Sequence, residues 1–415
     1  MAGTESIIKK SEGADIISAS LWFFFVIGLL SNILGGAVST LMAVYLPVVV
    51  RDLLGNSDKN FINDVSAYIN SVYIIGWTAG GFLWGMISDR FGRIISFHLS
   101  FALYGLFTLL IGFVSSWEIV VLMRLLSGFC VGGVLVISNI YLTEAWPVKS
   151  RAVYIGFLSI GFPIGIFSAG LTNYIFNSWR TGFMIGMIPV GLAVLSAIIL
   201  RNVEKQEGLK IHSTLNRNLK KVFNENHLDL LKGSVIFGSM LIGMWAVFSW
   251  LPTWIQSLLH NTDGQKERGI GMMLMGMGGL AGGFISGWVA RLLGLKRSLM
   301  ICFIGCIVMA LILFGLNKSF SSIIYMEIAL ITVFFGISQG LLGTYVPQLF
   351  ESAVRGTATG FCYNTGRVFT AAAVFFVGAL VSFFGGYSKT LLAFSVIFVI
   401  GLITIYNSKD LKFKT

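Results

Sequence analysis

Long runs of apolar residues, separated by short polar connections, fill almost the whole chain of 415 residues. Only 11% of the residues are charged, whereas soluble domains carry roughly 25%. So little charge cannot cover a surface that faces water. A helix that crosses the hydrocarbon core of a bilayer needs about 20 apolar residues. Most of the protein surface is therefore expected to face lipid.

Twelve stretches have the length and composition of membrane-spanning helices. Helix is expected for all of them, because an open strand edge leaves backbone groups without partners in lipid. The chain is thus predicted to be an all-α membrane protein with two pseudo-symmetric six-helix bundles. The predicted spans are 20–50, 65–87, 95–115, 117–142, 152–175, 179–200, 231–259, 268–290, 297–316, 320–348, 357–384 and 387–407.

Two short patterns recur in the two parts of the chain. Gly85 and Gly92 return as Gly287 and Gly294, after the second and the eighth predicted spans. Arg151 and Gly156 likewise return as Arg355 and Gly360. Both pairs point to a duplicated six-helix unit, from which many secondary transporters are built. The predicted division is a bundle at 1–200, a polar cytoplasmic linker at 201–230 and a second bundle at 231–415.

The formal net charge of +11 comes from lysines and arginines that gather on one side of the predicted membrane. Most of them lie in the two tails and in the loops that follow even-numbered spans. This bias predicts that both termini are cytoplasmic in a multi-pass protein of the inner membrane. It also explains the basic character without a nucleic-acid partner.

The loop after the second span reads Gly85-Met-Ile-Ser-Asp89-Arg90-Phe-Gly92-Arg93. This segment resembles the G-x-x-x-D-R-x-G-R motif of the major facilitator superfamily. The resemblance implies the fold of that family, transport by alternating access and a cytoplasmic latch that holds one conformation. The residues predicted for the latch are Gly85, Asp89, Arg90, Gly92, Arg93, Glu144, Arg151 and Arg355, with Glu144 expected to interact with Arg151.

Further segments resemble the subgroup of uptake carriers for organic and sugar acids, such as sialate and aromatic-acid proton symporters. They run from Arg124 to Gly133, from Glu144 to Arg151 and from Tyr345 to Arg367. The resemblance implies import of a small anionic metabolite, coupled to protons, by a monomer that needs no cofactor. Neutral-sugar uptake is the first alternative, and efflux by antiport is the second.

Two arginines lie well inside predicted spans, where a charge is costly and marks a candidate functional site. Arg367 is near the middle of the eleventh span and shares a helical face with Asn364. Arg124 enters the fourth span and shares a face with Asn139. A guanidinium can bind a carboxylate through two parallel hydrogen bonds. Arg124, Arg367, Asn364 and Asn139 are therefore predicted to bind substrate, with structural packing as the alternative for both arginines.

Glu327 is the only carboxylate well inside a predicted span. The first span has no acidic residue, although members of the resembling subgroup usually carry acids there. Glu327 is therefore the predicted proton carrier. Its place in the repeat is close to that of Arg124, which makes an ion pair between the bundles conceivable.

Polar and aromatic side chains in other spans complete the predicted substrate site. An aromatic ring beside an amide is a common platform for a sugar ring, and polar groups in lipid need partners. The additional candidates are Asn32, Gln339, Tyr345, Trp250 and Trp254.

No pattern in the chain predicts an enzyme or a metal site. The four cysteines, Cys130, Cys302, Cys306 and Cys362, lie in apolar runs without metal-ligand spacing. Gly336-Ile-Ser338-Gln-Gly340 fits the nucleophile pattern of hydrolases, but it lies within a predicted span and not at a strand-to-helix turn. Neither a metal nor a cofactor is expected.

Overall fold

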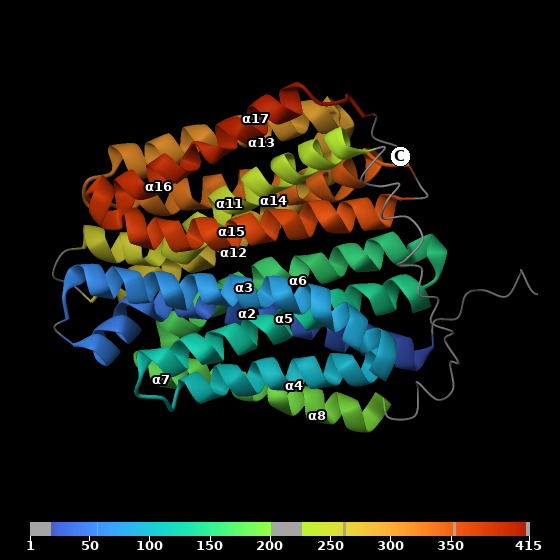
Figure 1. Ribbon diagram of the computed structural model, residues 1–415, viewed down its shortest axis with the longest axis horizontal. Helices are drawn as coiled ribbons and strands as arrows, with labels where there is room; N and C mark the ends of the chain where they lie inside the picture. The colour runs from blue at the N-terminus through green and yellow to red at the C-terminus, as the bar shows by residue number, and fades with distance from the viewer. Residues whose placement is uncertain (1–17, 56, 201–225, 260–262, 352–353, 412–415) are drawn as a thin grey trace, which may run out of the picture.

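The computed structural model describes residues 18–55, 57–200, 226–259, 263–351 and 354–411. Figure 1 shows two groups of helices that lie side by side with their long axes nearly parallel. We call α2–α8 the first half. It comprises α2 (Ala19–Leu54), α3 (Lys59–Phe91), α4 (Arg93–Ile111), α5 (Trp117–Ala145), α6 (Val148–Ile175), α7 (Trp179–Phe183), the 3-10 turn η1 (Met184–Gly186) and α8 (Met187–Leu200).

We call α11–α17 the second half. It comprises α11 (His227–Leu258), α12 (Gln265–Leu293), α13 (Leu295–Ala310), the π-helix η2 (Leu311–Leu316), α14 (Ile323–Gln348), α15 (Arg355–Phe384), α16 (Tyr387–Ser395) and α17 (Ile397–Tyr406). The prediction of an all-α membrane protein is confirmed. Residues 201–225 of the predicted linker lie outside the described residues, and its last four residues, 227–230, belong to α11.

Eleven helical stretches of the described chain are long and apolar enough to cross a membrane. Of the twelve predicted spans, the second corresponds to α3, which has 33 residues but is not among these eleven. Several polar side chains in its middle are instead buried against protein. Asn70 of α3 is buried and donates to the backbone carbonyl of Ser249 in the second half at 3.1 Å.

The repeated residues adopt the same local structure in both halves. Gly92 joins α3 to α4 with φ +92°, and Gly294 joins α12 to α13 with φ +80°. A side chain at either position would be strained. Arg151 donates from Nε to the carbonyl of Trp146, and Arg355 donates to that of Phe350, in each case five residues earlier. Both repeated sequence patterns therefore mark equivalent turns in the two halves.

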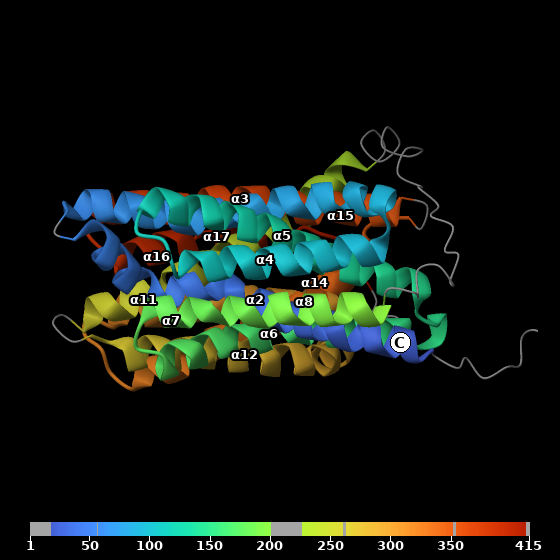
Figure 2. The same cartoon turned by 90° about the horizontal axis from the view of Figure 1, so that it is seen from below.

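The molecule has two distinct ends along its long axis. We call the end with Leu200, His227 and Tyr406 the linker end, and the opposite end, where α2 leads into α3, the far end (Figure 1). Figure 2 shows α6 of the first half alongside α12 of the second.

Hydrogen bonds join the halves at the far end. Asn60 accepts from Ser382 at 2.7 Å, and Asn63 accepts from Tyr387 at 2.9 Å. Gln265 donates to the backbone carbonyl of Asn173 at 2.6 Å. Between the residues that the structure describes, no ion pair joins the halves at the linker end. The three hydrogen bonds hold the halves together at the far end in this conformation.

Candidate functional site

A small polar cavity lies between the halves, where four long helices meet. Its volume of about 10 Å³ is close to the least space that one water molecule needs. The cavity is therefore nearly closed in this conformation. It is lined by Ser39, Thr40 and Ala43 of α2, Asn70, Tyr73 and Ile74 of α3, Arg124 of α5, and Trp245, Phe248 and Ser249 of α11.

Arg124 supplies the positive charge of the cavity. Its side chain is only 2% exposed, and its guanidinium lies 3.9 Å from the centroid of the Tyr73 ring. Nη1 and Nη2 donate to the backbone carbonyls of Val38 and Ser39 at 3.2 and 3.4 Å. No carboxylate of a described residue forms an ion pair with it, and its Nε has no hydrogen-bond partner among these residues. A buried cation without a counter-ion suits an anionic ligand.

Glycines bring α3 and α5 close enough for Arg124 to reach Tyr73. A Cβ added at Gly76 or Gly80 would fall on the carbonyls of Leu125 or Phe129 of α5. A Cβ at Gly128 or Gly132 would fall on carbonyls of α3. Small residues at such crossings let helix backbones pack closely in membranes. The arginine-to-tyrosine geometry therefore depends on this glycine interface.

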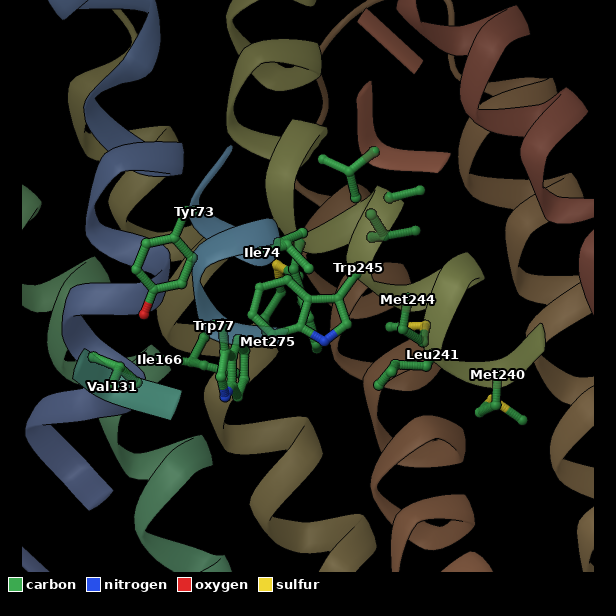
Figure 3. Close-up of a cluster of buried hydrophobic side chains, with 14 of the residues drawn as sticks. Tyr73, Ile74, Trp77, Val131, Ile166, Met240, Leu241, Met244, Trp245 and Met275 are labelled. Atoms are coloured by element: carbon green, nitrogen blue, oxygen red, sulfur yellow. The ribbon is translucent and has the colours of Figure 1, made fainter. Parts of the chain in front are cut away.

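Three rings from three helices lie between the cavity and the linker end. Trp77 stacks on Phe162 with ring centroids 5.6 Å apart and meets Trp245 edge-on at 5.2 Å. Figure 3 shows Trp77 and Trp245 together, with Tyr73 one turn along α3. We call Trp77, Phe162 and Trp245 the aromatic layer. Because it joins α3 and α6 to α11, any opening of the cavity toward the linker end must separate these rings.

Arg367 lies on the linker side of this layer. Its guanidinium is 5.7 Å from the centroid of Trp77, and Nη1 would lie 3.8 Å from a Cβ added at Gly81. Nη1 donates to Asn364 Oδ1 at 3.3 Å. The structure thus brings Arg367 and Asn364 together as predicted from their spacing, but places them outside the residues that line the cavity.

The two predicted tryptophans and the predicted tyrosine pack inside the second half, away from the cavity. Trp250 and Trp254 are fully buried and donate to the Val374 carbonyl at 3.1 Å and to Ser388 Oγ at 2.7 Å. Tyr345 is also buried and donates to the Lys409 carbonyl at the linker end at 2.7 Å. All three join elements of one half. Trp245, an earlier residue of α11, lines the cavity instead.

The three other predicted amides occupy different places. Asn32 donates to the carbonyl of Gly28 at 2.8 Å and to Ser138 at 3.3 Å, within the first half. Asn139 donates to the carbonyl of Leu135 in its own helix at 2.7 Å. Gln339 has a buried Nε2 without a partner among the described residues. None of the three lines the cavity of this conformation.

Glu327 is buried near the far end and is not paired with Arg124. Its Oε2 accepts a hydrogen bond of 2.6 Å from Asn317, directly after the π-helix η2. Asn317 also donates to the carbonyl of Leu313 at 3.0 Å. The conceivable ion pair between the halves is therefore not formed in this structure.

Three of the predicted latch residues meet at the linker end of the first half. Arg93 pairs with Asp89 at 2.7 Å and with Glu144 at 3.0 Å, and its Nε also donates to Glu144 at 3.3 Å. The expected interaction between Glu144 and Arg151 does not form, because Arg151 binds the Trp146 carbonyl at 2.9 Å. Arg90 forms no ion pair with a described residue.

Sequence reasoning did not assign most of the cavity lining to the site. Asn70, Tyr73 and Trp245 lie within long apolar helices, as many structural residues do. One signal was present: Asn70, Tyr73 and Trp77 recur at three- and four-residue spacing and so share a face of α3. That face meets the second half, which only the packing of the helices shows.

A cavity between two bundles of membrane-spanning helices is the arrangement found in many transporters. The family model of the Major Facilitator Superfamily matches residues 21–371. The protein belongs to this superfamily, as its loop motif predicted, and is a multi-pass transporter, not an enzyme.

Relatives named as transporters agree with this assignment, and solved structures share the fold. The chain is 26% identical to the cis,cis-muconate transport protein of Acinetobacter baylyi over 328 residues, which cover 76% of this chain and 78% of that protein. It is 26% identical to the sialic acid transporter NanX of Escherichia coli over 353 residues, covering 84% and 83%. The partially occluded, inward-open xylose transporter XylE of E. coli has a similar fold, with a TM-score of 0.75, 14% identity and coverage of 94% and 98%.

Proposed function

We propose that the protein imports a small organic acid or sugar acid across the inner membrane by alternating access, with the linker end facing the cytoplasm. Arg124 carries this proposal. Its buried guanidinium faces the cavity between the halves and has no counter-ion among the described residues. A carboxylate in the cavity would supply the missing charge. The names of the muconate and sialic acid relatives point to the same chemical class.

The cavity has features that suit a second part of such a substrate. Tyr73, Trp245 and Phe248 offer ring faces, while Ser39, Asn70 and Ser249 offer polar groups. A flat, unsaturated acid or a sugar acid would meet both kinds of surface. In the proposed cycle the aromatic layer parts when the linker end opens. The Asp89–Arg93–Glu144 cluster, with Gly85, Arg90, Gly92, Arg151 and Arg355 at the same end, is the proposed latch for one of the states.

Uptake into proteoliposomes that contain the purified protein tests the substrate class. We expect saturable uptake of radiolabelled cis,cis-muconate, niacin or sialic acid, because Arg124 favours a carboxylate. Excess xylose should not compete with the acid. Transport of xylose or glucose, with none of the acids carried, would contradict the proposal.

That outcome would support neutral-sugar uptake, the second candidate function. The observation in its favour is the cavity lining itself, in which hydroxyl and amide groups lie beside the rings of Tyr73 and Trp245. Arg124 would then be structural and would hold α2 to α5 through the carbonyls of Val38 and Ser39. A glucose transporter of Staphylococcus epidermidis, 24% identical over 380 residues, is among the relatives.

We also propose that Glu327 couples transport to protons. Glu327→Gln is expected to abolish accumulation driven by an inward proton gradient, because an amide cannot release a proton. Exchange of external for internal substrate should persist, since it needs no net proton movement. The measurement compares gradient-driven uptake with counterflow in the same vesicles.

Glu118→Gln provides the matched control, because Glu118 is an exposed carboxylate in the first turn of α5, also at the far end. This variant should behave as wild type in both assays. Gradient-driven accumulation by Glu327→Gln at the wild-type level would rule out Glu327 as the proton carrier.

A further inference from the structure

A second buried arginine lies at the far end of the second half, at a position that sequence reasoning did not single out. Arg268, in the first turn of α12, is only 1% exposed. Its Nη1 donates to the side-chain oxygen of Gln256 and, at 2.6 Å, to the backbone carbonyl of Asp263. Nε and Nη2 are buried and have no hydrogen-bond partner among the described residues.

The two unpartnered nitrogens form one edge of the guanidinium plane. Two parallel N–H groups on such an edge match the two oxygens of a carboxylate. Buried donors without partners are costly, so native proteins seldom leave them without a role. The contacts of Nη1 hold the side chain in place and leave this edge available.

A second buried polar side chain lies in the other half, where α6 contacts α12 at the far end. We call this contact between the halves the seam. Asn173 of α6 is completely buried, and its side-chain nitrogen and oxygen form no well-oriented hydrogen bond with a described residue, although the Tyr45 hydroxyl interacts with this side chain. Its backbone carbonyl accepts from Gln265, one turn before Arg268 on α12. The Tyr45 hydroxyl of α2 is within interaction range of both Asn173 and Arg268. Buried polar groups of both halves thus lie near Tyr45 where the halves join.

The seam is aligned with the cavity. Ser249, which lines the cavity, and Gln256, which holds Arg268, lie seven residues apart and share a face of α11. At 1.5 Å per residue, Gln256 is about 10 Å nearer the far end. A solute moving from the far end to Arg124 along α11 would therefore pass Arg268 first.

The charges around Arg268 leave its free edge unoccupied. Asp263 and Glu267 lie within its electrostatic range, as does Arg51, which adds a second positive charge. Neither carboxylate forms an ion pair with Arg268. The two acids therefore lie near Arg268 without pairing with its Nε or Nη2.

We propose that Arg268 and Asn173 form a carboxylate-binding site on the far side, distinct from the Arg124 cavity and completed when the halves part at the far end. An organic anion is held by the Nε–Nη2 edge before it reaches the cavity. The proposal depends on the proposed function only in requiring that the far end opens.

A cysteine reporter tests this site without a transport assay. Gln265→Cys, on the same face of α12 as Arg268, is introduced after the four native cysteines are replaced by alanine. Its labelling rate in proteoliposomes is measured with an anionic methanethiosulfonate, the ethylsulfonate, and a cationic one, the ethyltrimethylammonium. We expect Arg268→Gln to reduce the preference for the anionic reagent by about 10-fold, because the local positive potential is lost. Sodium benzoate should slow labelling when Arg268 is present, whereas sodium chloride at equal ionic strength should not.

Two further variants make the result specific. Arg180→Gln removes an arginine that is also at the far end but pairs with Asp52 at 3.0 Å, and it should leave the preference unchanged. Arg268→Lys keeps the charge but lacks the two-donor edge, so it should retain the preference and lose protection by benzoate. If Arg268→Gln does not fold, Arg268→Lys still tests the site through the loss of protection by benzoate.

The labelling results distinguish failure of the carboxylate site from failure of the proposed transport cycle. Equal reagent preference with and without Arg268, or equal slowing by benzoate and chloride, would overturn the carboxylate site while leaving alternating access intact. If neither reagent labels Gln265→Cys, the seam does not open, and both this site and the proposed transport cycle would be wrong.

Discussion

Arg124→Gln is expected to lower organic-acid uptake by about 100-fold, which corresponds to about 2.8 kcal/mol. Removing one partner of a buried charge pair usually costs about 2–5 kcal/mol. The neutral amide can still donate to the carbonyl of Val38 or Ser39, but it cannot supply the charge that a carboxylate needs. Initial uptake rates in proteoliposomes, normalised to the amount of reconstituted protein, give the effect.

Two comparisons separate substrate binding from a structural role for Arg124. Arg124→Lys keeps the charge and should retain more uptake than the glutamine variant, although it loses the planar fork. Arg180→Gln should transport normally, because its partner Asp52 lies near the surface and exposed pairs contribute little. Wild-type uptake by a folded Arg124→Gln protein would show that the arginine only packs α2 against α5.

Gly80→Val is expected to destabilise the protein by about 3 kcal/mol or more, at the upper end of overpacking effects. The added Cβ would fall on the carbonyl carbon and oxygen of Phe129, which are backbone atoms and cannot move aside alone. α3 and α5 would have to separate, and Tyr73 would move away from Arg124. The melting temperature in detergent and the yield of monodisperse protein should both fall sharply.

Gly191→Ala is the matched control for this glycine. No atom lies within 4 Å of a Cβ added at this position in α8. Alanine also has the higher helix propensity, so the melting temperature should stay constant or rise slightly. If Gly80→Val melts at the wild-type temperature, close packing of α3 on α5 does not determine the geometry of the cavity.

The apolar pattern of the sequence determined that most of the protein surface faces lipid. This in turn determined the helical architecture. Lipid offers the backbone no hydrogen-bond partner, so apolar runs of this length form helices, whose backbone bonds are made within the segment. Local signals marked the repeated turns, but the expected interaction of Glu144 with Arg151 does not form. Positive φ at Gly92 and Gly294, and the carbonyl bonds of Arg151 and Arg355, follow from short motifs whose partners lie within a few residues.

The site was predictable only in part, because it depends on how the helices face one another. Helical spacing correctly paired Arg367 with Asn364. Spacing alone does not distinguish Trp245, which lines the cavity, from Trp250 and Trp254, which pack inside one half. All three are apolar rings on one helix, and only its rotation between the halves decides which of them meets the cavity.

Tertiary structure also determined which charged groups are buried and which partners they have. In the sequence, Arg268 is one basic residue near a polar loop, and Arg124 is an arginine at the start of a span. Packing buries both, leaves donors on each without a partner among the described residues, and gives Glu327 an amide partner in place of an arginine. Whether a segment spans a bilayer depends on the composition of about 20 residues. The partner of a single charge depends on distances of a few ångströms between segments far apart in the chain, so it is determined only when the helices pack.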